Sequence, residues 1–201
     1  MPGTTLPPHL HGKRLTLRPF TPADEPQIAR SLADPEIARW AIGAGLRAVP
    51  PVECPARWLQ VRITSWAAGI PVFAIADSAT DALNGYIGLR SIHNGNAVVG
   101  SWIAPWARGR GMAAGALITA AAWALSPTSD NGLGLHRIEL HHTVGNPASC
   151  TVAGKAALTL EGTMRQATVD GHGVRHDSHL HARLATEPAP LRGRSGRVSP
   201  T

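Results

Sequence analysis

The residues best placed to do chemistry lie in one stretch, residues 101–114, which reads SWIAPWARGRGMAA. It begins as an apolar strand pattern, passes through Gly109 and Gly111, and continues as an apolar helix pattern from Met112. Glycine lets backbone N–H groups turn toward a ligand, and a helix start adds free donors and a partial positive charge. With Arg108 and Arg110 beside them, the segment predicts a cradle for an anion such as a pyrophosphate. A tight turn without any ligand would show the same pair of glycines.

The elements expected around this stretch alternate between strands and helices. Asn94-Gly95 predicts a tight hairpin turn, and Asn146-Pro147 predicts the capped start of a helix. This order predicts one α/β domain built around a mixed sheet. Strand patterns occupy residues 14–18, 72–76, 84–90, 97–103 and 136–142, helix patterns occupy 21–32, 55–68 and 112–125, and residues 164–167 and 174–184 form a final hairpin.

The two ends of the chain differ in composition from its body. Residues 1–12 are rich in proline and glycine and predict an irregular arm, and residues 185–201 predict a disordered basic tail. The tail holds three arginines and one glutamate, so it accounts for +2 of the net charge of +6. The remaining positive charges are scattered, and we therefore expect one domain over residues 13–184 that binds no nucleic acid.

Composition excludes several other classes of protein. A hydrophobic fraction of 43% rules out wholesale disorder, and no apolar run reaches the ~18 to 20 residues of a membrane span. No basic start is followed by an apolar stretch, so no secretory signal is expected. Two cysteines, Cys54 and Cys150, cannot form a disulfide framework or a four-cysteine zinc site. We expect a cytoplasmic protein with reduced thiols and without a membrane partner.

The loop Arg108-x-x-Gly111-x-Ala113 resembles the Arg/Gln-x-x-Gly-x-Gly/Ala loop of the GCN5-related N-acetyltransferases, the GNAT superfamily. The rest of residues 13–184 resembles the RimJ/RimL branch, whose members acetylate ribosomal-protein N-termini. The resemblance implies the GNAT fold, a mixed and mostly antiparallel sheet flanked by helices, with two splayed central strands. The stretches that carry it are RLTLRPF (14–20), DPEI (34–37), GYIG (85–88), HRIEL (136–140), NPAS (146–149) and LEG (160–162).

The resemblance implies acetyl-CoA as the co-substrate and gives the motif residues roles. The pantetheine arm would add along the strand at 101–103, the amides of 109–114 would hold the pyrophosphate, and an N–H near Ile103 would stabilise the oxyanion. Asn146 would contact the cofactor and Ser149 would act as general acid, although a helix cap and a first-turn residue explain both. The expected cofactor-binding residues are Ser101, Trp102, Ile103, Arg108, Gly109, Arg110, Gly111, Met112, Ala113, Ala114 and Asn146, and the expected catalytic residue is Ser149.

Two positions depart from the pattern of the family. Ala153 stands where many members have a tyrosine, and Thr168 stands where some have a carboxylate that serves as general base. Glu139, His141 and His93 remain candidate general bases. A structural or surface role would also explain each of them. Deprotonation through water is a further alternative, because an α-amine, with a pKa of ~8, needs less help than a lysine at ~10.4.

The histidines near the C-terminus are candidate metal ligands. His179 and His181 would share one face of a strand, as metal ligands do, and His172, His176 and Asp177 lie close by in the sequence. A solvated hairpin explains these residues equally well, so we expect no metal. Cys150 is expected to be a packing residue, because direct transfer requires no acyl-enzyme.

These observations predict an acetyl-CoA-dependent N-acetyltransferase that moves the acetyl group directly to a primary amine. The expected acceptor is the N-terminal α-amine of a protein or peptide. Acetylation of a small-molecule amine stays open, and so does a non-catalytic acyl-CoA-binding module, which Ala153 and Thr168 favour slightly but Asn146 and Ser149 count against. Acceptor contacts are expected from residues 40–51 and the last hairpin, with Trp102 and Trp106 as further candidates. A homodimer is also left open.

Overall fold

The computed structural model describes residues 7–41, 46 and 49–190, and within them eight strands form one sheet in the order β1-β2-β3-β4-β5-β6-β8-β7. The strands are β1 (Leu10–Gly12), β2 (Leu15–Arg18), β3 (Val72–Asp77), β4 (Leu83–His93), β5 (Asn96–Ile103), β6 (Arg137–Thr143), β7 (Thr159–Val169) and β8 (Arg175–Leu184). The helices are α1 (Glu25–Leu32), α2 (Pro35–Ala41), α4 (Cys54–Ser65), α5 (Met112–Leu125) and α6 (Pro147–Lys155), and the short 3₁₀ turns are η1 (Pro22–Asp24), η2 (Trp66–Ala68), η3 (Pro105–Ala107) and η4 (Thr128–Asp130). Six of the seven ladders between neighbouring strands are antiparallel, and the one parallel ladder joins β5 to β6. The predicted mixed, mostly antiparallel sheet is therefore confirmed.

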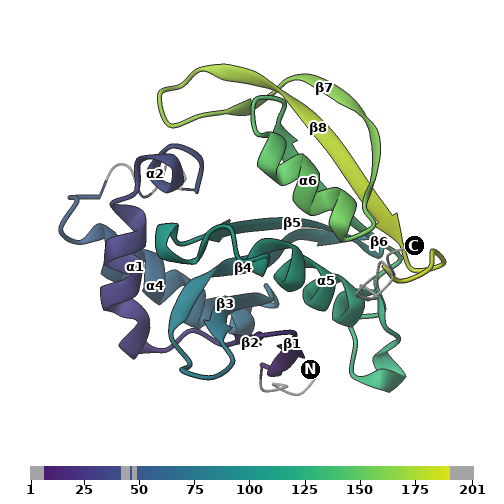
Figure 1. Cartoon of the computed structure of the whole chain (residues 1–201), viewed down its shortest axis with the longest axis horizontal. Coiled ribbons are helices and arrows are strands. Elements are labelled where there is room, and N and C mark those ends of the chain that lie inside the picture. Colours follow the sequence, from purple (N-terminus) through teal and green to yellow (C-terminus); the bar gives the residue numbers. More distant parts are fainter. Residues whose placement is uncertain (1–6, 42–45, 47–48, 191–201) are drawn as a thin grey trace, which may run out of the picture.

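Helices cover both faces of the sheet, and each face has its own core (Figure 1). Phe73 and Ile75 of β3 pack on the side of α5, while Val72 and Ala74 pack on the side of α1 and α4. Because side chains alternate along a strand, a strand buried on both faces reads as the continuous apolar run seen here. α5 lies against β1, β2, β4, β5 and β6, as its almost wholly apolar sequence predicts.

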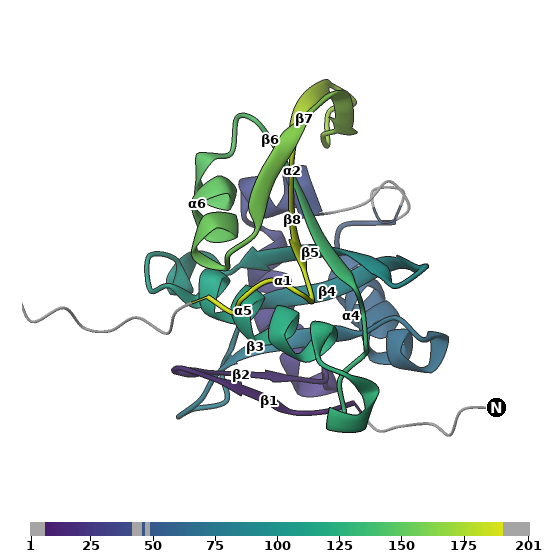
Figure 2. The same ribbon diagram turned by 90° about the vertical axis from the view of Figure 1, so that its right-hand side faces the viewer.

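The parallel ladder between β5 and β6 is short, and the two strands then diverge. It pairs Asn96–Val99 with Arg137–Leu140 and stops, although β5 continues to Ile103 and β6 to Thr143. β6 turns instead toward β8, which pairs with it along its whole length. Figure 2 shows β7 and β8 rising above the plane of β1–β5. This is the splayed arrangement of central strands that the GNAT resemblance implied.

The ends of the domain differ from the expectation in two places. Leu10–Gly12, expected to belong to an irregular arm, forms β1. It pairs with β2 because the backbone groups along the free edge of β2 can hydrogen-bond to it. At the other end, the Ala185 N–H donates to the His136 carbonyl, and the Glu187 carboxylate accepts from the Leu184 N–H. The start of the expected tail is thus attached to the domain, while residues 191–201 lie outside the described residues. None of the described helices is both long and apolar enough to span a membrane.

Candidate active site

The turn before α5 has the geometry of an anion cradle. Gly109 and Gly111 have φ angles of +76° and +75°, a left-handed conformation that favours glycine. A Cβ added at either position would meet no described atom within 4 Å, so open space lies over both. The first helical bond runs from the Gly115 N–H to the Gly111 carbonyl, which leaves the N–H groups of Met112, Ala113 and Ala114 without a helical acceptor. Free donors beside open space fit a pyrophosphate.

The end of β5 presents an unpaired edge toward the gap beside β6. The Ala104 N–H donates to the Asn84 carbonyl of β4 over 2.8 Å. Because backbone groups alternate along a strand, the N–H and C=O of the preceding residue, Ile103, point to the opposite edge. The Ile103 carbonyl accepts there from the Arg108 Nε at 3.3 Å. This edge can therefore offer a backbone N–H to a ligand lying in the gap.

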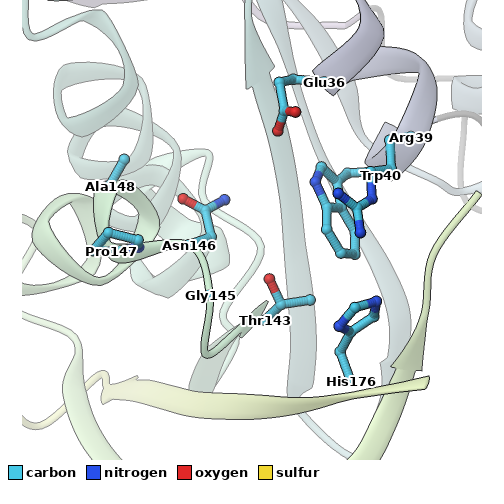
Figure 3. Close-up of a pocket in the computed structure, with 9 residues that line it drawn as sticks. All are labelled: Glu36, Arg39, Trp40, Thr143, Gly145, Asn146, Pro147, Ala148 and His176. Carbon is cyan, nitrogen blue, oxygen red and sulfur yellow. The ribbon is translucent and has the colours of Figure 1, made fainter. Parts of the chain in front are cut away.

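A cavity of about 320 Å³ opens where β6 ends and α6 begins (Figure 3). Glu36 and Trp40 of α2 reach into it from one side, and Thr143 lies across from them. The cavity combines a carboxylate with an aromatic face, which suits a cation that carries an apolar part. Its lining is completed by Arg39, Gly145, Asn146, Pro147, Ala148 and His176.

A buried carboxylate holds the two sides of this cavity together. Asp170, at the turn between β7 and β8, has no exposed surface, and it accepts from Arg39 of α2 over 2.8 Å and contacts His176 at 3.0 Å. Burial alone raises its pKa, but hydrogen bonds from His176 and Arg39, and from the N–H groups of Val174 and His172, outweigh it. The pKa of Asp170 therefore lies well below its ordinary value. Residues of the last hairpin and of the segment near residue 40 thus meet at one cavity, and their role as the acceptor side stays a prediction.

A family model of the acetyltransferase (GNAT) domain matches residues 14–159 of the chain. The chain belongs to the GNAT acetyltransferase family. It is an acetyltransferase by that membership, and the predicted superfamily and enzyme class are confirmed. A search of curated proteins found no match to the sequence.

Solved structures of other GNAT enzymes share the fold. RimJ of Mycobacterium smegmatis, in complex with CoA-disulfide, superposes with a TM-score of 0.74 at 21% identity, over 89% of this chain and 88% of that one. A ribosomal-protein-alanine acetyltransferase of Vibrio fischeri has a TM-score of 0.71 at 18% identity, over 90% and 98% of the two chains. A RimL ribosomal alpha-N-protein acetyltransferase in complex with coenzyme A has a TM-score of 0.71 at 21% identity, over 88% and 98%. Members of the predicted RimJ/RimL branch are therefore among the similar folds.

Asn146 and Ser149 of this GNAT domain stand at the start of α6. The Asn146 Oδ1 accepts from the Ser149 N–H over 3.1 Å, so the cap expected from the sequence is present. Asn146 also lines the cavity, and Ser149, which is half-buried, follows Ala148 of the lining. Ala153, one turn later, is fully buried and offers no hydroxyl. The contact of Asn146 with a cofactor and the acid role of Ser149 stay predictions.

Two other predicted cofactor residues, Arg108 and Trp102, have structural roles of their own. Arg108 forms an ion pair with Asp34 at 2.7 Å, and this hydrogen bond is the main reason that the pKa of Asp34 is lowered. Arg108 thus tethers the cradle to the segment before α2, while Arg110 is exposed on the same turn. Trp102 is buried and packs on Trp58, with ring centroids 5.7 Å apart, so its side chain belongs to the core.

The three candidate bases lie at different distances from the end of β5 and from the cavity. His93 sits at the turn before β5, and the length of that strand puts it roughly 23 Å from Ile103. Glu139 and His141, 2.9 Å apart, share the face of β6 that leads to Thr143 at the cavity. Burial raises the pKa of Glu139, but its bonds to Arg137 and His141 outweigh this and lower it.

The cavity contains residues that sequence reasoning did not single out. Glu36 belonged to the DPEI stretch, which was noticed only as part of the resemblance. Trp40 lines the cavity, whereas Trp102 and Trp106 are absent from the described lining. The Arg30 guanidinium instead lies over the Trp106 ring, with the Arg30 Cζ 4.2 Å from the ring centroid. The signal that could have found Glu36 was its place in the first turn of a helix beside the expected acceptor segment.

Proposed function

We propose that this GNAT enzyme transfers an acetyl group from acetyl-CoA to the N-terminal α-amine of a protein or peptide. The observation that carries the proposal is the cavity at the splayed end of β5 and β6, with Glu36 in its wall. The likeness to RimJ and RimL structures supports the same acceptor class.

The cradle and the open edge of β5 would bind the co-substrate. The N–H groups at residues 109–114 would hold the pyrophosphate, with Arg110 and the helix dipole as further positive charge. The pantetheine arm would lie along residues 101–103, and the Ile103 N–H would stabilise the oxyanion that forms on the thioester carbonyl. The acetyl group would then lie in the gap between β5 and β6, beside the cavity.

In the reaction, the amine nitrogen bonds to the carbonyl carbon, and the C–S bond then breaks. The attacking amine must first lose a proton, and we assign this proton to Glu36, directly or through a water molecule. The departing thiolate takes a proton from Ser149, and the Ser149 hydroxyl is restored by the second proton that the nitrogen loses as the amide forms. A carboxylate is a weak base, and it suits an α-amine with a pKa of ~8 better than a lysine at ~10.4.

A second cavity favours a peptide acceptor over a small amine. It measures about 610 Å³, is lined mainly by apolar residues of α1, α2 and α4, and meets the first cavity at Arg39. Gly171 and His172 of the last hairpin close its other side. A small amine would fill only the first cavity, whereas the side chains after a peptide's first residue could occupy the second.

The test is acetylation of a panel of peptides, read by mass spectrometry that locates the acetyl group. Peptides with a free N-terminus should be acetylated there, and the same peptides with a blocked N-terminus and an internal lysine should not. Acetylation of small amines alone would favour the small-molecule alternative. Binding of acetyl-CoA without turnover of any amine would favour the non-catalytic module.

Variants of Glu36 test the assignment within the cavity. Glu36→Gln removes the basic carboxylate but not the shape, and should lower kcat/KM for the peptide by roughly 100- to 10,000-fold, the usual contribution of a general base. Glu25→Gln, on an exposed helix start, is the matched control and should leave kcat/KM unchanged. If His141→Asn removes the acidic limb of the pH profile, where a base loses activity by protonation, and Glu36→Gln does not, His141 is the base.

A further inference from the structure

Four side chains with metal-binding atoms converge under α6, on the side of β6 that faces away from the cavity. They are His142 of β6, His179 and His181 of β8, and Cys150 of α6, and their ligand atoms all lie within 4.8 Å of one another. The register pairs His142 with His179 and Leu140 with His181, which places the three imidazoles on one face of the sheet. α6 lays Cys150 on that face, with its Sγ 3.6 Å from the His181 Nε2.

The hydrogen bonds of the imidazoles leave two ring nitrogens with lone pairs that face each other. The His142 Nδ1 lies 2.8 Å from the Thr143 carbonyl oxygen, and the His181 Nδ1 lies 3.4 Å from the Leu158 carbonyl oxygen. A carbonyl only accepts, so each Nδ1 carries the proton and each Nε2 does not. These two Nε2 atoms are 3.2 Å apart. Metal-bound histidines are oriented in this way, with the second ring nitrogen donating to a carbonyl.

A proton between the two Nε2 atoms is the alternative, and the surroundings count against it. His142 and His181 are 7% and 3% exposed, and the described cluster of ligand atoms contains no carboxylate. A buried imidazolium without a counter-charge is costly. The Nδ1 of His179 is also buried without a hydrogen-bond partner among the described residues. A divalent cation would satisfy all of these atoms together.

We propose that His142, His179, His181 and Cys150 bind a zinc ion in a tetrahedral site. Zn–N bonds of ~2.05 Å and a Zn–S bond of ~2.3 Å separate the ligand atoms by roughly 3.3 Å (N to N) and 3.6 Å (N to S) in a tetrahedron. The separation of 3.2 Å between the His142 and His181 Nε2 atoms and that of 3.6 Å from the His181 Nε2 to the Cys150 Sγ match these values, and the other ligand-atom separations are within 4.8 Å. Imidazole and thiolate donors select zinc over magnesium or calcium, and binding releases the thiol proton of Cys150.

Four protein ligands leave zinc no open position, so the site is structural and takes no part in acetyl transfer. It joins β6, β8 and α6, which have no covalent connection at this point. α6 also carries Asn146 and Ser149, and the ion would therefore hold in place the helix start that lines the cavity. The sequence pointed to His179 and His181 but, without the register and the path of α6, did not bring His142 and Cys150 to them.

The test uses the full chain, stripped of metal with a chelator and then titrated with Zn²⁺ or Co²⁺. We expect one zinc per chain by elemental analysis and a rise in Tm of roughly 5 to 15 °C on zinc binding. Co²⁺ should give the strong visible bands of a tetrahedral site and a thiolate charge-transfer band in the near ultraviolet. A spectrum without the charge-transfer band would overturn the assignment of Cys150, and no bound metal would overturn the site.

The second cysteine provides a matched control. Cys150→Ala should abolish the charge-transfer band, whereas Cys54→Ala, in the core on the other face of the sheet, should keep it. In the unaltered chain, zinc should slow alkylation of Cys150 at least tenfold relative to the metal-free chain, as read by mass spectrometry of each thiol. Equal alkylation of Cys150 with and without zinc would overturn the proposal even if a variant failed to fold.

Discussion

Among single residues, Ser149 offers the sharpest separation between a catalytic and a structural role. Its neighbour Asn146 supplies the cap of α6, so the Ser149 hydroxyl is not needed for the helix. If the hydroxyl protonates the thiolate, Ser149→Ala should lower kcat by roughly 10- to 1000-fold and leave KM for acetyl-CoA and Tm nearly unchanged. Steady-state kinetics and a thermal melt measure these quantities.

Thr151, two residues further along α6, is the control for this change. Its hydroxyl donates to the Pro147 carbonyl and is exposed, so Thr151→Ala should keep kcat. A Ser149→Ala enzyme with full kcat would remove Ser149 from the mechanism. A large rise in KM with a normal kcat would make Ser149 a residue that positions the cofactor.

At the scale of elements, the turn that starts α5 should decide cofactor binding. In Gly111→Val a branched side chain would enter the open space over the cradle and strain a backbone at φ +75°. We expect acetyl-CoA binding to be lost in titration calorimetry. Gly69→Val imposes the same strain at φ +72°, also with open space around it, but at the end of η2, and should bind normally. Equal affinity in the two variants would refute the cradle.

The contact between α2 and the β7–β8 turn should respond to acid. The folded state lowers the pKa of Asp170, so its contribution to stability is complete above the unfolded pKa of ~3.9 and is lost as the pH falls below it. Asp170→Asn should therefore destabilise the protein at pH 7 and reduce the loss of stability between about pH 4 and pH 2. Denaturant unfolding at several pH values measures this effect, and Asp130→Asn, at an exposed site, should leave the profile unchanged.

At the scale of the whole molecule, the boundary of the C-terminal tail can be tested by truncation. A chain that ends after Pro190 should keep its Tm, because the hydrogen bonds at the end of β8 are intact. A chain that ends after Leu184 loses three of them, each worth about 1 kcal/mol, and its Tm should fall by roughly 6 to 12 °C. Equal Tm values for the two chains would support the boundary predicted from the sequence, with the domain ending at residue 184 and the tail starting at residue 185.

Local signals in the sequence predicted most of the elements. Asn94-Gly95 forms the β4–β5 turn with positive φ at both residues, and Asn146 caps α6 as its side chain allows. These features depend on neighbours within a few residues. β1 was missed because a three-residue strand becomes ordered only when β2 offers it an edge.

The candidate site was harder to predict because it depends on distant contacts. Arg39 meets Asp170 across 131 positions of sequence, and no local pattern reveals that pairing. The same holds for His142 and His181, whose ring nitrogens meet only through the register of two strands. The glycine turn and helix start of the proposed cradle were predictable, since these residues are consecutive in the chain.

The order of strands also has a consequence for how the protein is synthesised. β1 to β5 lie side by side in chain order, so this half of the sheet can form as the chain leaves the ribosome. β6 then presents an open edge until β8, the last of the described strands, pairs with it, and open edges promote aggregation. β8 also carries His176 into the cavity. A newly made molecule therefore completes its cavity and covers its exposed edge in the same step.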